Sequence, residues 1–200
     1  MEYLTKKDIN ECVKILKNGG ILAFPTETVF GLGVISSSEI AFSKLVETKK
    51  RPPNKPFTMM CSKLEQVDNY VEINETTKKV VKAFMPGPIT IVAKAKKNVP
   101  SYLDLKSGFI GFRIPDDEFV LKMIDKVGSA LLVPSANPSN EAPALTDKEV
   151  IKYFDNEIDG VVEGVCDKLS PSTVVKINES EITVLREGPI SKEQIMEAIK

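Results

Sequence analysis

The chain has 200 residues and a formal net charge of −1, from 27 basic and 28 acidic side chains, and it contains no histidine. A chain of this length buries its own apolar core, so we expect residues 1–200 to form a single domain. The lack of histidine excludes Ser-His triads and His-ligated zinc, and the near-neutral charge provides no overall field that attracts nucleic acid.

The cysteines and the apolar runs indicate the compartment. Cys12, Cys61 and Cys166 are scattered without metal-ligand spacing, which is typical of buried thiols in a reducing environment. No apolar run approaches the ~20 residues of a membrane span, and residues 1–10 lack the apolar core of a secretory signal. We therefore expect a cytoplasmic protein with no membrane partner.

Helical spacing and capping residues predict a series of helices along the chain. The first is expected to be capped by Thr5, with Asp8 three residues later, and to end at Gly19-Gly20. The others are expected at residues 38–47, 62–71, 75–84, 117–127, 146–154 and 191–199. Capping-box spacing marks Ser62/Glu65, Thr146/Glu149 and Ser191/Gln194.

Apolar and β-branched runs predict strands between these helices. They are expected at residues 21–24, 56–60, 89–95, 108–114, 130–133, 160–162, 173–177 and 182–185. Several runs are apolar throughout, as expected when helices cover both faces of a sheet. The pattern predicts an α/β fold with a twisted, mostly mixed open sheet that is flanked by helices.

A basic segment follows the second predicted helix. It carries Lys49, Lys50, Arg51 and Lys55 among three prolines, Pro52, Pro53 and Pro56. One interpretation is a solvated helix end whose cations favour the helix dipole. The other is a stiff cationic loop that binds a triphosphate with little ordering cost. Since the chain has no Walker or Rossmann glycine motif, ATP would have to be held by scattered cations of this kind.

Polar side chains also stand at the ends of the predicted strands. Arg113 and Arg186 are placed to bind a carboxylate or phosphate, or to pair with a structural carboxylate. Ser135 and Asn137 lie between two prolines and offer polar groups to one ligand, or form an ordinary turn. The stretch 26–28 forms either a polar rim or a helix N-cap.

Together these segments resemble the threonylcarbamoyl-AMP synthase family, the YrdC/TsaC-like proteins. The resemblance rests on K-x-R at 49–51, S-x-N at 135–137, the opening Pro25–Leu32 and the turn Met85–Thr90. Segments 111–115, 172–175 and 185–190 follow in the family's order, so the match covers about residues 8 to 190. Phe30 and Met85 replace the family's usual tyrosine and tryptophan, and the chain is similar to the family's short form.

The resemblance implies a YrdC/RibB-like fold with a large concave cavity. In that cavity L-threonine, bicarbonate and ATP would be condensed to threonylcarbamoyl-AMP and pyrophosphate. Mg²⁺ would be carried by the nucleotide, with no metal site in the protein. A separate transferase complex would then move the threonylcarbamoyl group to adenosine 37 of tRNA, so that tRNA is an indirect partner.

Motif matching also transfers the family's site residues onto this chain. The catalytic set would be Lys49, Arg51, Ser135 and Asn137. ATP would contact Arg51, Lys55, Phe109, Ser135, Pro143 and Arg186. L-Threonine would contact Thr28, Met60, Arg113, Val133 and Ser172.

The expected chemistry suits a cationic site without a covalent nucleophile. Attack of a carbamate oxygen on the α-phosphorus brings two anions together, so preorganised cations and donors are the expected catalysts. The main alternative is a non-catalytic, double-stranded RNA-binding module of the same fold, in which the basic loop contacts the phosphodiester backbone. Weak RNA binding beside catalysis also remains open.

Overall fold

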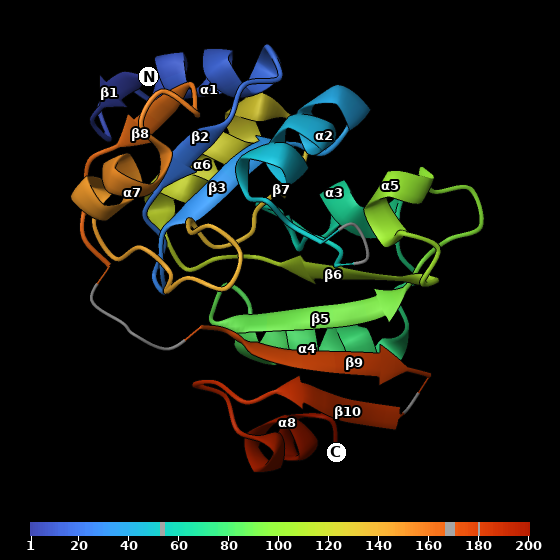
Figure 1. Ribbon diagram of the computed structural model, residues 1–200. Helices are drawn as coiled ribbons and strands as arrows, with labels where there is room; N and C mark the ends of the chain where they lie inside the picture. The colour runs from blue at the N-terminus through green and yellow to red at the C-terminus, as the bar shows by residue number, and fades with distance from the viewer. Residues whose placement is uncertain (53–54, 167–170, 180) are drawn as a thin grey trace.

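The computed structural model describes residues 1–52, 55–166, 171–179 and 181–200, and it confirms the expected mixed α/β architecture (Figure 1). Within these residues ten strands form one open sheet in the order β1-β8-β2-β3-β7-β4-β6-β5-β9-β10. The strands are β1 (Glu2–Leu4), β2 (Leu22–Phe24), β3 (Gly31–Ile35), β4 (Met59–Met60), β5 (Ile89–Lys94), β6 (Phe109–Arg113), β7 (Leu131–Leu132), β8 (Gly160–Val162), β9 (Thr173–Asn178) and β10 (Glu181–Arg186).

The sheet mixes both pairing directions, as expected. β8 pairs in parallel with β1 and β2, and the pairs β4–β6 and β5–β9 are also parallel. The pairs β2–β3, β3–β7, β4–β7, β5–β6 and β9–β10 are antiparallel. β5 is antiparallel to β6, and β9 is antiparallel to β10. The start of β5 therefore lies beside the end of β6, and the start of β9 lies beside the end of β10.

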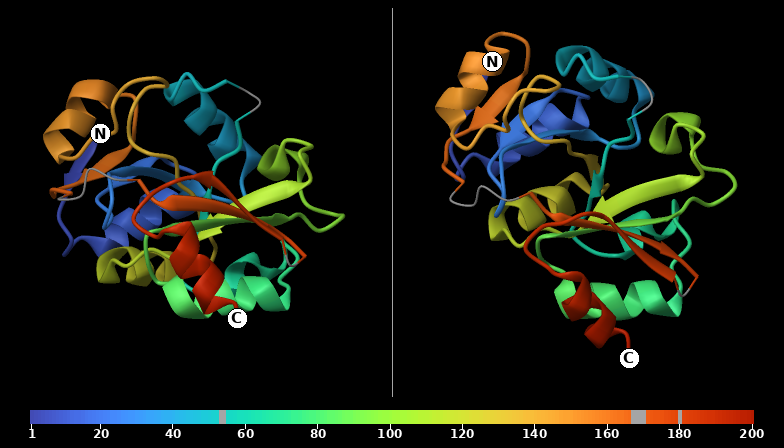
Figure 2. Two further views of the ribbon diagram at one scale, coloured as in Figure 1. Left: turned by 90° about the horizontal axis from the view of Figure 1, so that it is seen from below. Right: turned by 60° about the horizontal axis from the view of Figure 1, so that its bottom comes forward.

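Helices cover the sheet unevenly. They are α1 (Ile9–Lys17), α2 (Glu39–Thr48), α3 (Glu65–Asp68), α4 (Glu75–Phe84), α5 (Ser101–Asp104), α6 (Glu118–Val127), α7 (Asp147–Phe154) and α8 (Lys192–Ala198). α1 packs on α6, whereas α4 packs on α8 beneath β5, β9 and β10, as Figure 2 shows from below. None of the helices in the described parts of the chain is long and apolar enough to cross a membrane.

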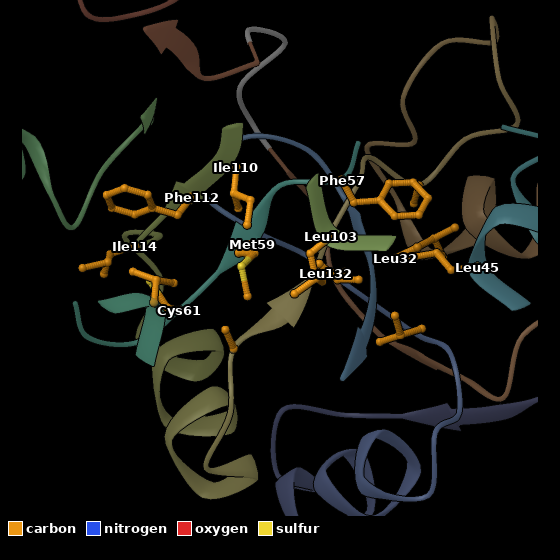
Figure 3. Close-up of a cluster of buried hydrophobic side chains, with 14 of the residues drawn as sticks. Leu32, Leu45, Phe57, Met59, Cys61, Leu103, Ile110, Phe112, Ile114 and Leu132 are labelled. Atoms are coloured by element: carbon orange, nitrogen blue, oxygen red, sulfur yellow. The ribbon is translucent and has the colours of Figure 1, made fainter. Parts of the chain in front are cut away.

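Alternation along the strands divides the apolar side chains into two clusters. In β2 and the residue before it, Ile21 and Ala23 enter one cluster, and Leu22 and Phe24 enter the other, with α1 and α6. Helices therefore cover both faces of this half of the sheet. Figure 3 shows part of the larger cluster, where Met59 of β4 lies between its cross-strand neighbours Phe112 and Leu132.

On one face of the other half of the sheet, the described residues line cavities. Ile89, Ile91 and Val175 belong to the larger cluster, which includes Val80 of α4 and Ile195 of α8. Their alternating neighbours Thr90 and Val174 instead line cavities on the opposite face, as does Gly111 of β6. This open face is where side chains remain available to a ligand.

Two predicted helix starts are wrong. The N-cap of α1 is Asp8 instead of Thr5, and the Asp8 carboxylate accepts hydrogen bonds from the Thr5 amide at 2.8 Å and its hydroxyl at 2.7 Å. The expected helix 62–71 is reduced to α3, and the Gln66 side chain accepts from the Ser62 amide at 2.8 Å. That contact replaces the predicted Ser62/Glu65 capping box.

The other capping predictions are confirmed, and two strands appear that were not predicted. Capping boxes form at Thr146/Glu149 and Ser191/Gln194, as the spacing indicates. The predicted strands 56–60 and 130–133 are shorter in the structure, where β4 and β7 have two residues each. The two strands that were not predicted are β1 and β3. β1 is only three residues long, and β3 contains Gly31 and Gly33, which weaken a strand pattern in the sequence.

Phe112 tests how much the larger cluster contributes to stability. Its side chain is fully buried at the centre of the sheet. We expect Phe112→Ala to lower the free energy of unfolding by about 3–5 kcal/mol, since a large cavity remains. Urea unfolding measures this, with the exposed Ile40→Ala as the control, for which a change within about 0.5 kcal/mol is expected. Equal effects of the two substitutions would contradict the packing described here.

Candidate active site

A cavity of about 260 Å³ lies where loops and strand ends meet on the open face of the sheet. Its walls come from the turns after β2 and β7, from the segment before and within β4, from β5, from the chain before β9 and from the ends of β6 and β10. Three arginines line it, together with hydroxyl and apolar side chains. Of the residues expected from the sequence it contains Thr28, Arg51, Met60, Arg113, Val133, Ser135, Pro143, Ser172 and Arg186.

A second cavity of about 410 Å³ adjoins the first and shares lining residues such as Phe57 and Thr90 with it. It contains Phe109, so the structure places this predicted ATP contact in the neighbouring space. The Lys176 ammonium lies 3.5 Å from the centre of the Phe109 ring. The two cavities together offer a cationic compartment beside a more apolar one.

Arg113 is held in place by three groups at the wall of the first cavity. Its Nε donates to the Gly87 carbonyl at 3.2 Å, and its Nη1 donates to the Thr28 hydroxyl at 3.2 Å. Its Nη2 forms a short ion pair with Glu27 Oε1, which also accepts from the Asp116 amide at 3.0 Å. A guanidinium has five N–H donors, so two remain for a ligand. Arg113 therefore pairs with a structural carboxylate, which was one interpretation of the sequence. It also lines the cavity, as the interpretation of a ligand-binding arginine requires.

Arg186 has a comparable arrangement. Its Nε and Nη2 donate to the Ser172 carbonyl at 3.1 and 2.8 Å, and Nη2 also reaches the Ser172 hydroxyl at 3.2 Å. That hydroxyl lies 2.9 Å from Thr90 Oγ1. Burial, and then the nearby Arg113 charge, lowers the pKa of Arg186. The repulsion shows that two cations share one environment, which favours an anionic ligand between them.

Arg51 reaches the cavity from the loop after α2. Its Nε donates to the Lys55 carbonyl at 2.9 Å, its Nη2 donates to the Pro56 carbonyl at 3.0 Å, and its guanidinium lies 4.8 Å from the Phe57 ring centre. Burial lowers the pKa of Arg51. Lys55 contributes this carbonyl, but its side chain is exposed and lies outside the cavity lining. Pro53, one of the three prolines expected to stiffen the loop, lies outside the described residues.

The end of α2 sends neighbouring side chains in different directions. Lys50 adopts a left-handed conformation with φ of 49° just after the C-cap residue Lys49. Its amide donates to the Glu47 carbonyl at 2.9 Å, and the Arg51 amide donates to the Val46 carbonyl at 3.0 Å. These bonds form a Schellman motif, which reverses the chain. Arg51 therefore turns to the cavity, whereas Lys49 turns away from it.

Lys49 is buried behind the cavity wall. Its ammonium donates to the main-chain carbonyls of Ser135 and Asn137, the latter at 2.6 Å. Ser135 faces the cavity and donates its hydroxyl to Asn137 Oδ1 at 2.6 Å, while Asn137 does not line the cavity. Burial, and then the Arg51 charge, lowers the pKa of Lys49 to about 7. The structure thus brings the predicted catalytic set together but presents only Arg51 and Ser135 to the cavity.

The polar stretch after β2 forms a turn at the rim of the cavity. The Thr26 hydroxyl donates to the Val29 carbonyl at 2.8 Å and lies 3.0 Å from the Thr28 hydroxyl. Since β3 follows, the helix N-cap interpretation is wrong and both threonines line the cavity. The sequence did not single out Glu27 as the partner of Arg113, because the two residues lie 86 positions apart.

Comparison with known proteins identifies the family. The Sua5/YciO/YrdC family model, described as telomere recombination, matches residues 14–188. The chain belongs to the Sua5/YciO/YrdC family. This confirms the resemblance found in the motifs, because the matched region contains every site residue discussed above.

Several members of the Sua5/YciO/YrdC family are similar over most of the chain. A threonylcarbamoyl-AMP synthase of Enterobacter sp. is 31% identical over 169 residues, which cover 83% of this chain and 89% of that protein. The structure of Pyrococcus abyssi Sua5 complexed with L-threonine has a TM-score of 0.92 and 28% identity, and it covers 99% of this chain. This chain spans only 60% of that protein's length. Escherichia coli YciO shares the fold, with a TM-score of 0.86, 23% identity and coverage of 97% of this chain and 98% of that one.

The left-handed Lys50 predicts a stabilising substitution. A residue with a side chain is strained at this φ, whereas glycine is not. We expect Lys50→Gly to raise the free energy of unfolding by about 1 kcal/mol, measured by urea unfolding. The matched control Lys50→Ala also removes the charge but keeps the strain, so it is expected to bring no gain. A gain in both variants would assign the effect to the lost charge.

The lowered pKa of Lys49 predicts a pH-dependent stability difference. This pKa falls from 10.5 in the unfolded chain to about 7 in the folded protein. The unfolded state then binds more protons between these values, so the contribution of Lys49 to the free energy of unfolding rises as pH increases through this window. Urea unfolding of the wild type and Lys49→Met from about pH 7 to 10 measures the difference. A difference that stays constant with pH would contradict the shift.

Proposed function

We propose that this protein condenses L-threonine, bicarbonate and ATP into threonylcarbamoyl-AMP and pyrophosphate. The observation that carries the proposal is the meeting of Arg51, Arg113 and Arg186 in one cavity. The names of related proteins support it, since the Enterobacter relative is a threonylcarbamoyl-AMP synthase. The Pyrococcus abyssi Sua5 structure, which is complexed with L-threonine, supports an amino acid as one ligand.

The charge of the cavity favours anionic ligands. In the described part of the chain, Arg113 pairs with Glu27, whereas the hydrogen bonds of Arg51 and Arg186 go to carbonyl and hydroxyl oxygens. Such oxygens satisfy the donors but do not neutralise the charge. Two positive charges in partly buried positions therefore remain for the phosphates of a nucleotide or for a carboxylate.

The hydrogen bonds around Arg113 suit an amino acid. We assign the threonine carboxylate to the two N–H groups that Arg113 has left. The hydroxyls of Thr28 and Ser172 then lie within the same wall, close enough to the guanidiniums to meet the amine or the hydroxyl of the substrate. Met60 and Val133 supply an apolar surface for its methyl group.

The remaining cations and the second cavity suit ATP. We place the phosphates against Arg51, Ser135 and Arg186, with Lys55 available from the exposed loop. The adenosine would lie toward Pro143 and the space beside Phe109, because the two cavities share a wall. The described residues that line the first cavity include no carboxylate, so we leave Mg²⁺ with the nucleotide phosphates, where it keeps several waters.

The reaction needs two bond-forming steps. The threonine amine first attacks the carbon of bicarbonate, which loses water and leaves an N-carboxylated threonine, a carbamate. A carbamate oxygen then attacks the α-phosphorus of ATP, and the bond to pyrophosphate breaks. Each step brings anionic groups together, so fixed guanidiniums that oppose their repulsion and orient them lower the barrier.

The product suggests a place in RNA modification. Threonylcarbamoyl-AMP is a mixed anhydride that can acylate an amine, and we propose that a separate transferase complex delivers its acyl group to adenosine 37 of tRNA. We further propose that the protein acts in the cytoplasm. Direct contact with RNA, including double-stranded RNA, would be weak, because the net charge of the chain is −1.

Turnover of the purified protein tests the proposal. With ATP, bicarbonate and labelled L-threonine, we expect threonine-dependent release of pyrophosphate and a threonylcarbamoyl-adenylate product. Arg51→Ala and Arg113→Ala are each expected to cut turnover by on the order of a hundredfold, since each removes a fixed donor from the charged transition state. Lys122→Ala, which removes one member of an exposed ion pair on α6, is the control.

Two results would contradict this assignment. No product from folded wild-type protein would reject the synthase reaction, and salt-sensitive RNA binding in the same preparation would then favour the binding module. Wild-type turnover in Arg51→Ala or Arg113→Ala would show that the altered residue does not serve the reaction.

A further inference from the structure

We infer that Lys49 is a positioning residue that fixes the Ser135–Asn137 turn through its ammonium group, and that it does not bind the phosphates of the substrate. The inference deepens the proposed function, because Ser135 is one of the residues assigned to ATP. Its geometric basis, however, is independent of the reaction.

Burial and direction separate Lys49 from the cavity. The residue is 1% exposed, and it is absent from the cavity lining, to which Arg51 belongs. Two of its three ammonium protons are used by the main-chain carbonyls of Ser135 and Asn137. An ammonium that is committed in this way and enclosed by protein is poorly placed to meet a triphosphate on the far side of the turn.

The main chain of Lys49 ties the same two segments together. Its carbonyl, one of the unpaired groups at the C-terminus of α2, accepts from the Ser139 amide and the Ser139 hydroxyl, both at 3.0 Å. Four hydrogen bonds thus connect the C-cap residue of α2 to the loop 135–139. They link segments about ninety positions apart in the chain.

The two motifs therefore divide their work in the same way. In K-x-R, Arg51 faces the cavity and Lys49 holds the neighbouring loop. In S-x-N, Ser135 faces the cavity, while Asn137 accepts from Ser135 and donates to the Glu141 carbonyl at 2.8 Å. Each motif supplies one residue for the ligand and one residue for the support.

This division has a consequence for catalysis. Without the ammonium, two carbonyl groups in the turn lose their donors and the turn is free to relax. A displacement of about 1 Å at a reacting site can cost on the order of a hundredfold in rate. Anion binding depends on the guanidiniums of the cavity lining, to which Lys49 does not belong, so it is expected to survive.

The experiment compares anion binding with turnover in Lys49→Met, Lys49→Gln and Arg51→Met. Inorganic pyrophosphate is the anion probe, and calorimetry gives its Kd. We expect Lys49→Met to change this Kd by no more than about threefold while turnover falls on the order of a hundredfold. Arg51→Met, which loses a cavity cation, is expected to weaken pyrophosphate binding by about tenfold or more. Equal weakening in Lys49→Met and Arg51→Met would overturn the inference.

Lys49→Gln separates the donor from the charge. A glutamine amide can donate to both carbonyls without a positive charge, so a positioning role predicts partial recovery of turnover relative to Lys49→Met. A phosphate ligand would instead make the two neutral variants equally poor. Should Lys49→Met fail to fold, Lys49→Gln and Ser139→Ala carry the test. Ser139→Ala is expected to lower turnover and leave the pyrophosphate Kd unchanged, and a weakened Kd in both variants would count against positioning.

Amide hydrogen exchange keeps this inference separate from the proposed reaction. The Ser139 amide, which donates to the Lys49 carbonyl, is expected to exchange faster in Lys49→Met, which removes the donor from the turn, than in the wild type. If the wild type forms no threonylcarbamoyl-adenylate but this amide loses protection, the reaction assignment fails and the positioning role stands. If protection of the turn is unchanged in the variant, the positioning role fails whatever the reaction is.

Discussion

The site depends on positive charges that are satisfied as hydrogen-bond donors but not neutralised. Arg51 and Arg186 both donate to main-chain carbonyls, which carry only partial negative charge. Burying a donor without a partner is costly, and these carbonyls remove that cost. The net charge of these two guanidiniums remains, although burial lowers the pKa of both. An anionic ligand would neutralise this positive charge, which the protein itself does not neutralise.

The mixed sheet is what brings these charges together. In an all-parallel arrangement, the end of one strand would lie beside the end of the next. Here the starts of β5 and β9 lie beside the ends of β6 and β10, so Thr90 and Ser172 come next to Arg113 and Arg186. A register shift between Val184 and Arg186 also changes the pairing just where Arg186 leaves the sheet. Reversals of direction thus gather residues from distant positions at one edge.

Much of the architecture was predictable because it is local. Helix 75–84 was predicted with the observed bounds, and the capping boxes before α7 and α8 were predicted from four-residue patterns. β3 was not predicted, because its glycines have a tertiary cause. A Cβ on Gly33 would lie 2.6 Å from the Phe24 ring, which is too close for two carbon atoms. Glycine is therefore required at this position by a side chain of the neighbouring strand β2, and not by the conformation of β3 itself. No pattern within β3 contains that information.

The site shows the same limit. The ordered motifs include residues that line the cavity, such as Arg51 and Ser135, but they do not indicate which way each side chain faces. For Lys49 and Arg51, the direction depends on the left-handed conformation of Lys50. A lysine rarely adopts this conformation, and the sequence has no glycine at this position that would have indicated it. For Arg113 it is set by Glu27, and for Lys49 by carbonyls in the loop 135–139, all far away in the chain. The direction in which a side chain points depends on tertiary contacts. Motif matching therefore identifies the residues of the site but does not separate those that line the cavity from those that support it.

This division affects how function is inferred within the Sua5/YciO/YrdC family. YciO shares the fold at 23% identity, and a fold by itself does not identify a reaction. The supporting residues Lys49 and Asn137 would be needed by any member that keeps these two loops joined, whatever ligand it binds. The residues that line the cavity, Arg51, Arg113, Ser135 and Arg186, are those that are available to a ligand. Evidence for the synthase reaction therefore has to come from the residues that line the cavity. The supporting residues indicate only that the two loops are held together.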